Sequence, residues 1–202
     1  MSDTISRDRF ECLFAIAASQ MGHVTTRQAR DCGMASNLIE YHVRRGRLKR
    51  VHRGVYRLRD YPSAPREEVM AAWLAAGPHR AVVSHESALD LFQLGDVIPD
   101  DIHLMVSRSV RNLPRLEGVR FHTTSIPLTD DDVVVRDGIR ITSVARTILD
   151  LAQSGLAPDQ IDLAVRQALD RGLVLEDQLE TAASGRSHRV QQLIRDATGA
   201  AA

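Results

Sequence analysis

The spacing of apolar residues near the N-terminus predicts two successive helices. The first covers residues 8–20, where apolar side chains recur every three or four positions. The second is short and begins at Thr25, which is spaced to form a capping box with Gln28. It extends to Cys32, and Gly33 supplies the turn that follows. The stripe that the first helix is expected to bury consists of Phe10, Leu13, Phe14 and Ala17.

A third helix is predicted to begin at Ser36, which serves as its N-cap, and to end at Gly46. Ile39 and Val43 are four residues apart and therefore share one face, which must be buried. The opposite face carries polar, aromatic and basic side chains. Such a face is typical of an ordinary solvated helix as well as of a helix that reads DNA. Its members are Asn37, Tyr41, Arg44 and Arg45.

The residues after this helix favour DNA binding. Two short β-compatible runs, 48–51 and 55–58, flank a glycine turn at Gly54 and predict a hairpin with a basic tip. Two helices joined by a glycine turn and followed by a hairpin form a winged helix-turn-helix. Eight basic residues and no acidic residue lie between Arg44 and Arg59. The predicted DNA-binding residues are Arg27, Gln28, Asn37, Tyr41, Arg44, Arg45, Arg47, Lys49, Arg50 and Arg53.

This segment resembles the N-terminal winged-helix domain of the AbiEi family, the antitoxins of AbiE-type, type IV toxin–antitoxin modules. The resemblance implies a protein that represses its own operon by binding double-stranded operator DNA. It also implies opposition to a nucleotidyltransferase-type toxin encoded nearby, with or without a stable complex. The matching positions are Gly22, Val24, Thr25, Gln28, Gly33, Ile39, Val43, Gly46, Leu48, Arg50, Val51, Arg53, Gly54, Val55 and Tyr56.

The rest of the chain predicts an α+β domain, with a small, mostly antiparallel sheet flanked by helices. Two prolines between residues 60 and 65 mark the boundary, so the domains are expected at residues 1–61 and 66–197. Asp137-Gly138 is typical of a type I′ hairpin turn. Strands are expected at 81–83, 102–106, 119–122, 133–136 and 139–142, and helices at 66–76, 84–94, 143–153, 158–171, 176–183 and 188–197.

Charge divides the chain in the same place. Residues 1–62 hold twelve basic and six acidic side chains, whereas the remainder holds fourteen basic and twenty acidic ones. This division favours nucleic-acid binding by the N-terminal part alone. Cys12 and Cys32 are interpreted as free, buried thiols of a protein in the reducing cytoplasm. The polar N-terminus is unlike a secretion signal, and no apolar run approaches transmembrane length.

Catalytic chemistry finds little support in the pattern of residues. Ser84 and His85 could form a nucleophile pair, but an N-cap serine beside an exposed histidine is the preferred interpretation because no nucleophile-elbow motif surrounds them. The acids at 130–132 are consecutive and do not converge as metal ligands would. We therefore expect no enzyme activity, no cofactor and no metal. The alternatives are a plain winged-helix regulator with a ligand-sensing or dimerising second domain, and an enzyme or nuclease relic using Ser84, His85 and Asp130.

Overall fold

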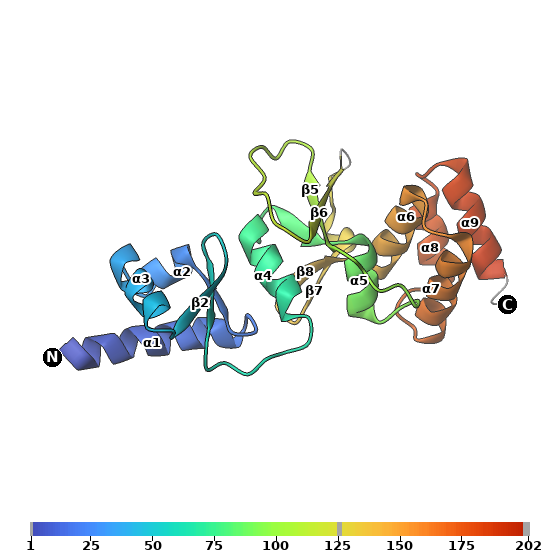
Figure 1. The fold of residues 1–202 in the computed structure, drawn as a ribbon. Helices are drawn as coiled ribbons and strands as arrows, with labels where there is room; N and C mark the ends of the chain where they lie inside the picture. The colour runs from blue at the N-terminus through green and yellow to red at the C-terminus, as the bar shows by residue number, and fades with distance from the viewer. Residues whose placement is uncertain (1, 125–126, 200–202) are drawn as a thin grey trace. The chain divides into compact units, whose positions relative to one another are not determined.

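The computed structural model describes residues 2–124 and 127–199, which divide into two compact units (Figure 1). The first unit extends to Ala81 and also contains Arg111–Glu117 and Arg136–Ile139. The second unit contains Val82–Val110, Gly118–Val135 and the chain from Arg140 onward. Helices and strands together form the α+β architecture expected from the sequence.

The first unit begins as a winged helix-turn-helix. Its sheet has the strand order β1-β3-β2, and both strand pairs are antiparallel. Helix α4 follows the wing and contacts all three strands. The elements are α1 (Ser2–Ala18), β1 (His23–Thr25), α2 (Thr26–Asp31), α3 (Ser36–Arg44), β2 (Leu48–His52), β3 (Val55–Leu58) and α4 (Glu67–Ala76).

A small apolar core holds the three N-terminal helices against the wing. Leu13 and Ala17 of α1 are fully buried in it, as expected. Phe14, however, is 52% exposed, so its prediction as a core residue was wrong. Helix α1 contacts α2, β1 and β3. The face of α1 that carries Leu13 and Ala17 is the buried one, and the neighbouring Phe14 lies outside it. The remaining buried members are Val24, Ala29, Cys32, Met34, Ile39, Leu48 and Leu58.

The two cysteines form a disulfide, which corrects the expectation of free thiols. Cys12 on α1 and Cys32 at the C-cap of α2 have their Cα atoms 5.8 Å apart, within the range that a disulfide spans. The helical pattern placed each residue on its own helix but could not show that these two helices touch. The bond connects α1 covalently to the first helix of the helix-turn-helix. The argument for a reducing compartment therefore loses its basis.

Helix α4 is buried along almost its whole length, including Met70, Trp73 and Leu74. The Trp73 indole Nε1 donates a hydrogen bond to the Ala81 carbonyl at 2.9 Å. Contacts assign this helix to the first unit, although the proline-rich connection precedes it. A domain boundary at residues 61–66 therefore remains a prediction from the sequence.

The second unit contains a five-stranded sheet with the order β6-β5-β4-β8-β7. The sheet is mixed, because β4 pairs with β8 and β5 pairs with β6 in parallel register. The expectation of a mostly antiparallel sheet missed these pairs, since parallel pairing is set by long connections rather than by local turns. The strands are β4 (Ala81–Val83), β5 (Ile102–Ser107), β6 (Val119–Thr124), β7 (Val133–Arg136) and β8 (Ile139–Thr142).

The one tight connection in this sheet follows the sequence prediction. Asp137 and Gly138 join β7 to β8 with φ angles of 51° and 79°. Two consecutive positive φ angles are the signature of a type I′ turn. The helices of this unit are α5 (His85–Phe92), α6 (Val144–Ser154), α7 (Pro158–Asp170), α8 (Glu176–Ala183) and α9 (His188–Gly199), and a 3-10 helix, η1, spans Asp130–Asp132.

A buried network of ion pairs organises the start of α6. Arg146 is 5% exposed, and its Nε donates to Asp150 at 2.8 Å while a terminal nitrogen lies 3.5 Å from Asp132. Arg186 binds the other oxygen of Asp150 at 2.9 Å. The two arginines and two aspartates balance in charge, which is the condition under which buried ions are tolerated. Within residues 2–124 and 127–199, no helix is long and apolar enough to cross a membrane.

Reduction of the Cys12–Cys32 bond should destabilise the first unit, because the bond restricts an unfolded loop with a sequence separation of 20 residues. The expected loss is about 3 kcal/mol of unfolding free energy. Chemical unfolding followed by circular dichroism, with and without dithiothreitol, measures it. Cys12→Ser should have the same unfolding free energy as the reduced wild type, and dithiothreitol should not change it. Equal stability of the oxidised and reduced wild type would contradict the prediction.

Candidate nucleic-acid interface

The capping box at the start of α2 fixes the entry to the helix-turn-helix. The Thr25 hydroxyl accepts from the Gln28 backbone N–H at 3.2 Å, and the Gln28 side-chain oxygen accepts from the Thr25 N–H at 2.8 Å. The Gln28 amide also donates to Gln20 at 2.9 Å. These bonds occupy the Gln28 side chain, so it holds α2 in place instead of facing solvent. Its neighbour Arg27 is exposed.

Helix α3 is held on the core through one face. Ile39 and His42 are each 1% exposed, whereas the predicted partner Val43 is only half-buried. The helix begins one residue earlier than expected, with Ala35 as N-cap, so the prediction of Ser36 as cap was wrong. The Ser36 hydroxyl instead accepts from Arg30 of α2 at 3.0 Å. This hydrogen bond connects the two helices at their turn.

Sequence reasoning missed the role of His42. Its ring meets Phe10 edge-on, with ring centroids 4.6 Å apart, and therefore joins α3 to α1. Burial, together with the charge of Arg47, lowers the pKa of His42 and keeps it neutral. A histidine in a basic segment gives no signal of burial by itself. Its position three residues after Ile39 on the same helix face is the signal that could have found it.

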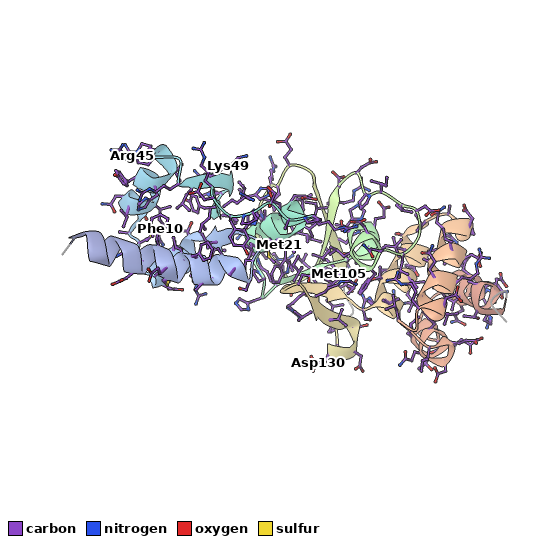
Figure 2. All side chains as sticks on the ribbon, turned by 90° about the horizontal axis from the view of Figure 1, so that it is seen from below. Phe10, Met21, Arg45, Lys49, Met105 and Asp130 are labelled. Atoms are coloured by element: carbon purple, nitrogen blue, oxygen red, sulfur yellow. A yellow bond between two sulfur atoms is a disulfide. The ribbon has the colours of Figure 1, made fainter. Side chains whose placement is uncertain are left out.

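The opposite face of α3 lies in solvent. Asn37, Tyr41, Arg44 and Arg45 are all exposed, as the helical pattern predicted. The Arg45 guanidinium lies 5.5 Å from the centroid of the Tyr41 ring, a cation–π distance that orders both side chains. Figure 2 labels Arg45 and Lys49 on the same side of the winged helix-turn-helix, and α3 contacts β2. The structure thus brings the helix face and the beginning of the wing together.

The wing is tied to α2 at its tip. Gly54 has a φ of 79°, and its carbonyl accepts from the Thr26 N–H at 2.8 Å and from the Thr26 hydroxyl at 3.3 Å. Arg53 precedes this anchored glycine and is exposed. The pairing of β2 with β3 shifts between Arg50 and His52, and such an irregularity bends a hairpin and redirects its side chains. The tip is therefore held in place while its arginine stays accessible.

The basic side chains of this surface are not neutralised within the described part of the chain. Among residues 2–124 and 127–199, the six predicted cations from Arg44 to Arg53 are exposed and form no ion pair. Arg57 differs, because it is largely buried and binds Glu67 at 3.0 Å. A surface that leaves its exposed cations unpaired suits a polyanion, since phosphates can replace the counterions around it. The six are Arg44, Arg45, Arg47, Lys49, Arg50 and Arg53.

The second unit contains a buried histidine cluster where the sequence indicated a serine–histidine pair. The Ser84 hydroxyl lies 2.9 Å from His85 Nδ1, and Ser84 is the N-cap of α5. His85 is 6% exposed, which corrects the prediction of an exposed histidine. It stacks on His122 with ring centroids 3.6 Å apart, and His103 lies 5.0 Å from His122. The rings come from α5 and from the parallel strands β5 and β6, and this parallel pairing has no local sequence signal.

Burial dominates the electrostatics of this cluster. It lowers the pKa of His85 to about 3 and that of His122 to about 4, with further lowering by the neighbouring histidines. Burial and the charge of Arg120 also lower the pKa of His103. The three rings are therefore neutral near pH 7.

Asp130 lies in η1, at the lower edge of the view in Figure 2, and shares no pocket lining with Ser84 or His85. With Asp131 and Asp132 it lines a cleft of about 980 Å³, whose other walls are the start of α6 and helix α8. The proposed enzymatic trio of Ser84, His85 and Asp130 is thus divided between two places. Among the described residues, no group of three or more His, Cys, Asp or Glu is arranged to hold a metal ion.

Comparison with known proteins finds a family match for the N-terminal segment. Residues 12–59 match the family model of the AbiEi antitoxin, a transcriptional regulator, which confirms the resemblance noted in the sequence. The fold of the chain is similar to that of the RV2827C protein from Mycobacterium tuberculosis, with 16% identity and a TM-score of 0.61. That likeness covers 94% of this chain and 75% of the other. No curated protein matches the sequence.

Lowering the pH should destabilise the second unit. In the unfolded chain His85 and His122 take up protons near pH 6.5, whereas in the folded protein their pKa values are about 3 and about 4. Between pH 7.5 and 5 we expect a loss of roughly 2 kcal/mol for each strongly shifted histidine. His122→Phe keeps an aromatic ring but cannot titrate, and should reduce this pH dependence in urea unfolding. His79→Gln, at an exposed histidine, is the control, and an equal pH dependence of stability in the two variants would contradict the assignment.

Proposed function

We propose that the protein is a DNA-binding antitoxin that represses its own operon through the winged helix-turn-helix. Its second function, implied by the AbiEi resemblance, is to oppose a nucleotidyltransferase-type toxin encoded beside it. The observation that carries the DNA-binding part is the set of six exposed, unpaired cations on α3 and the wing. The match of residues 12–59 to an antitoxin transcriptional regulator supports the same function. A cytoplasmic location follows from this role.

The exposed residues suit a division between base reading and phosphate binding. Asn37, Tyr41 and Arg44 lie on the solvent face of α3 and would enter the major groove, where amide and guanidinium groups recognise base edges. The wing tip would reach the backbone or the minor groove through Arg53. The flanking phosphate contacts are assigned to Arg27, Arg45, Arg47, Lys49 and Arg50. Gln28 acts differently in this scheme, because its capping box holds α2 in position.

The second unit is the part to which we assign the action against the toxin. Its surface carries exposed acids, among them Asp130, Asp131 and Asp177 around the cleft. Phosphate would be repelled there, so this unit does not compete with the wing for DNA. No catalytic step is assigned to it, because Ser84 and His85 are buried together and Asp130 lies elsewhere.

One observation favours a second candidate, a plain transcriptional regulator. The cleft of about 980 Å³ is large enough for a small-molecule effector, with Leu149 and Val174 among its apolar lining. In that case the second unit would sense a ligand and no toxin would be involved. A neighbouring reading frame for a nucleotidyltransferase favours the antitoxin, and its absence favours the regulator.

Arg44→Ala and Arg53→Ala should each weaken binding to duplex DNA from the protein's own promoter. Loss of the base-reading Arg44 should cost about 1–3 kcal/mol and relax sequence preference. Loss of Arg53 as a phosphate contact should make the dependence of log affinity on log salt shallower by about one. Fluorescence anisotropy across a salt series measures both. Wild-type affinity in both variants would show that the docking described above is wrong.

Repression and protection from the toxin should separate genetically. Full-length protein carrying both Arg44→Ala and Arg53→Ala should lose repression of a promoter reporter, because the DNA contacts are gone. It should still protect cells that express the adjacent nucleotidyltransferase from an independent promoter, because the second unit is intact. Arg189→Ala with Arg195→Ala, at exposed arginines of α9, provides a control of equal charge for repression. Loss of protection by the wing variant would move the antitoxin activity onto the DNA-binding element.

A further inference from the structure

A second basic element lies outside the winged helix-turn-helix, in the loop between β5 and β6 (Figure 1). This loop, residues 108–118, is long because β5 and β6 are parallel neighbours. A parallel pair cannot be joined by a tight turn, since the chain must return along the strand before the next one starts. The fold therefore requires a crossover at this point, and the sequence of that crossover is free to serve another purpose.

The crossover is an ordered segment with defined ends. At its start, the Arg108 N–H donates to the Thr124 carbonyl at 2.8 Å. At its end, the Ile102 N–H donates to the Gly118 carbonyl at 2.8 Å. Between them, Leu113, Pro114 and Leu116 are partly buried. Their partial burial indicates that the loop packs in part against the protein.

The charged side chains that this loop presents to solvent are three arginines, Arg108, Arg111 and Arg115, and one acid, Glu117. Arg111 and Arg115 are exposed, and within the described residues neither has a hydrogen-bond or ion-pair partner. No acidic residue occurs from Ser107 to Leu116. Four residues of extended chain span at most roughly 14 Å, so both guanidinium groups can reach one stretch of a phosphate backbone. The loop keeps a net positive charge despite Glu117, and exposed arginines without an ion-pair partner are well suited to such contacts.

The loop belongs to the unit that binds DNA in the proposed function. Contacts assign Arg111–Glu117 to the first unit, together with the winged helix-turn-helix and α4, although the strands on either side lie in the second unit. These arginines are therefore grouped with the basic winged helix rather than with the acidic cleft. That grouping favours DNA over an acidic protein as the occupant.

We propose that the β5–β6 loop is a second DNA-contact element, in which Arg111 and Arg115 bind backbone phosphates in addition to those bound by the wing. The proposal rests on the DNA-binding function proposed above and extends its footprint. Phosphate contacts carry no sequence information, so the element adds affinity to any duplex and leaves the choice of operator to α3.

The test measures binding of the full-length protein to a fluorescein-labelled duplex of mixed sequence, about 40 bp or four helical turns long. Arg111→Gln with Arg115→Gln should reduce the slope of log affinity against log salt by about two and weaken binding at 100 mM salt by at least about tenfold. Arg111→Lys with Arg115→Lys should restore most of the slope, because a phosphate contact needs the charge. The matched control, Arg189→Gln with Arg195→Gln on α9, should bind like wild type.

The outcomes distinguish this proposal from the function on which it rests. If the wild-type protein binds the duplex and the double substitution Arg44→Ala with Arg53→Ala weakens that binding, DNA binding through the wing is supported. If the loop variant then equals the α9 control, the second contact element alone is wrong. If wild type binds no duplex at all, the DNA-binding function itself fails and the loop proposal fails with it. Circular dichroism of each variant checks that the exposed substitutions leave the fold unchanged.

Discussion

The exposed basic surface of α3 depends on how few buried groups hold this helix in place. A helix of nine residues is too short to be stable alone, so its neighbours must supply the stabilisation. They do so through Ile39 in the core, the His42 ring against Phe10, and the Arg30 contact to Ser36. Because these contacts occupy one face only, the other face is free for polar and basic side chains. The disulfide between α1 and α2 reinforces the same framework.

The basic residues of the first unit fall into two groups, one with a structural partner inside the protein and one without. Arg57 is largely buried. It forms an ion pair with Glu67 at 3.0 Å and donates hydrogen bonds to the Leu58 and Tyr61 carbonyls. Within the described residues, the exposed cations of α3 and the wing form no ion pair. Clustered like charges repel and lower stability, so an unpaired cluster has no structural benefit of its own. The unpaired arginines are therefore the ones best explained by an external anion.

How much the sequence could predict depends on the range of the interaction involved. The capping box of Thr25 and Gln28, the turn at Asp137-Gly138 and the exposed face of α3 were predictable because each is set by residues close in sequence. Phe14 was misplaced, and the thiols were taken as free, because both depend on which helix lies beside α1. The candidate DNA-binding residues were placed by local pattern, and all but Gln28 are exposed. The histidine cluster was missed because parallel strand pairing brings His103 and His122 together.

The second unit buries polar groups in two different ways, and the difference explains its surface charge. His85 and His103 are buried and His122 is partly buried, all as neutral rings, which avoids the cost of desolvating charge. Arg146 is buried charged and is neutralised by Asp132 and Asp150. Since neither cluster leaves a net charge inside, the acidity of this part of the chain resides in exposed residues. In the proposed function, an acidic exterior keeps the second unit from competing for phosphate, so the contacts with DNA would fall to the cations of the first unit.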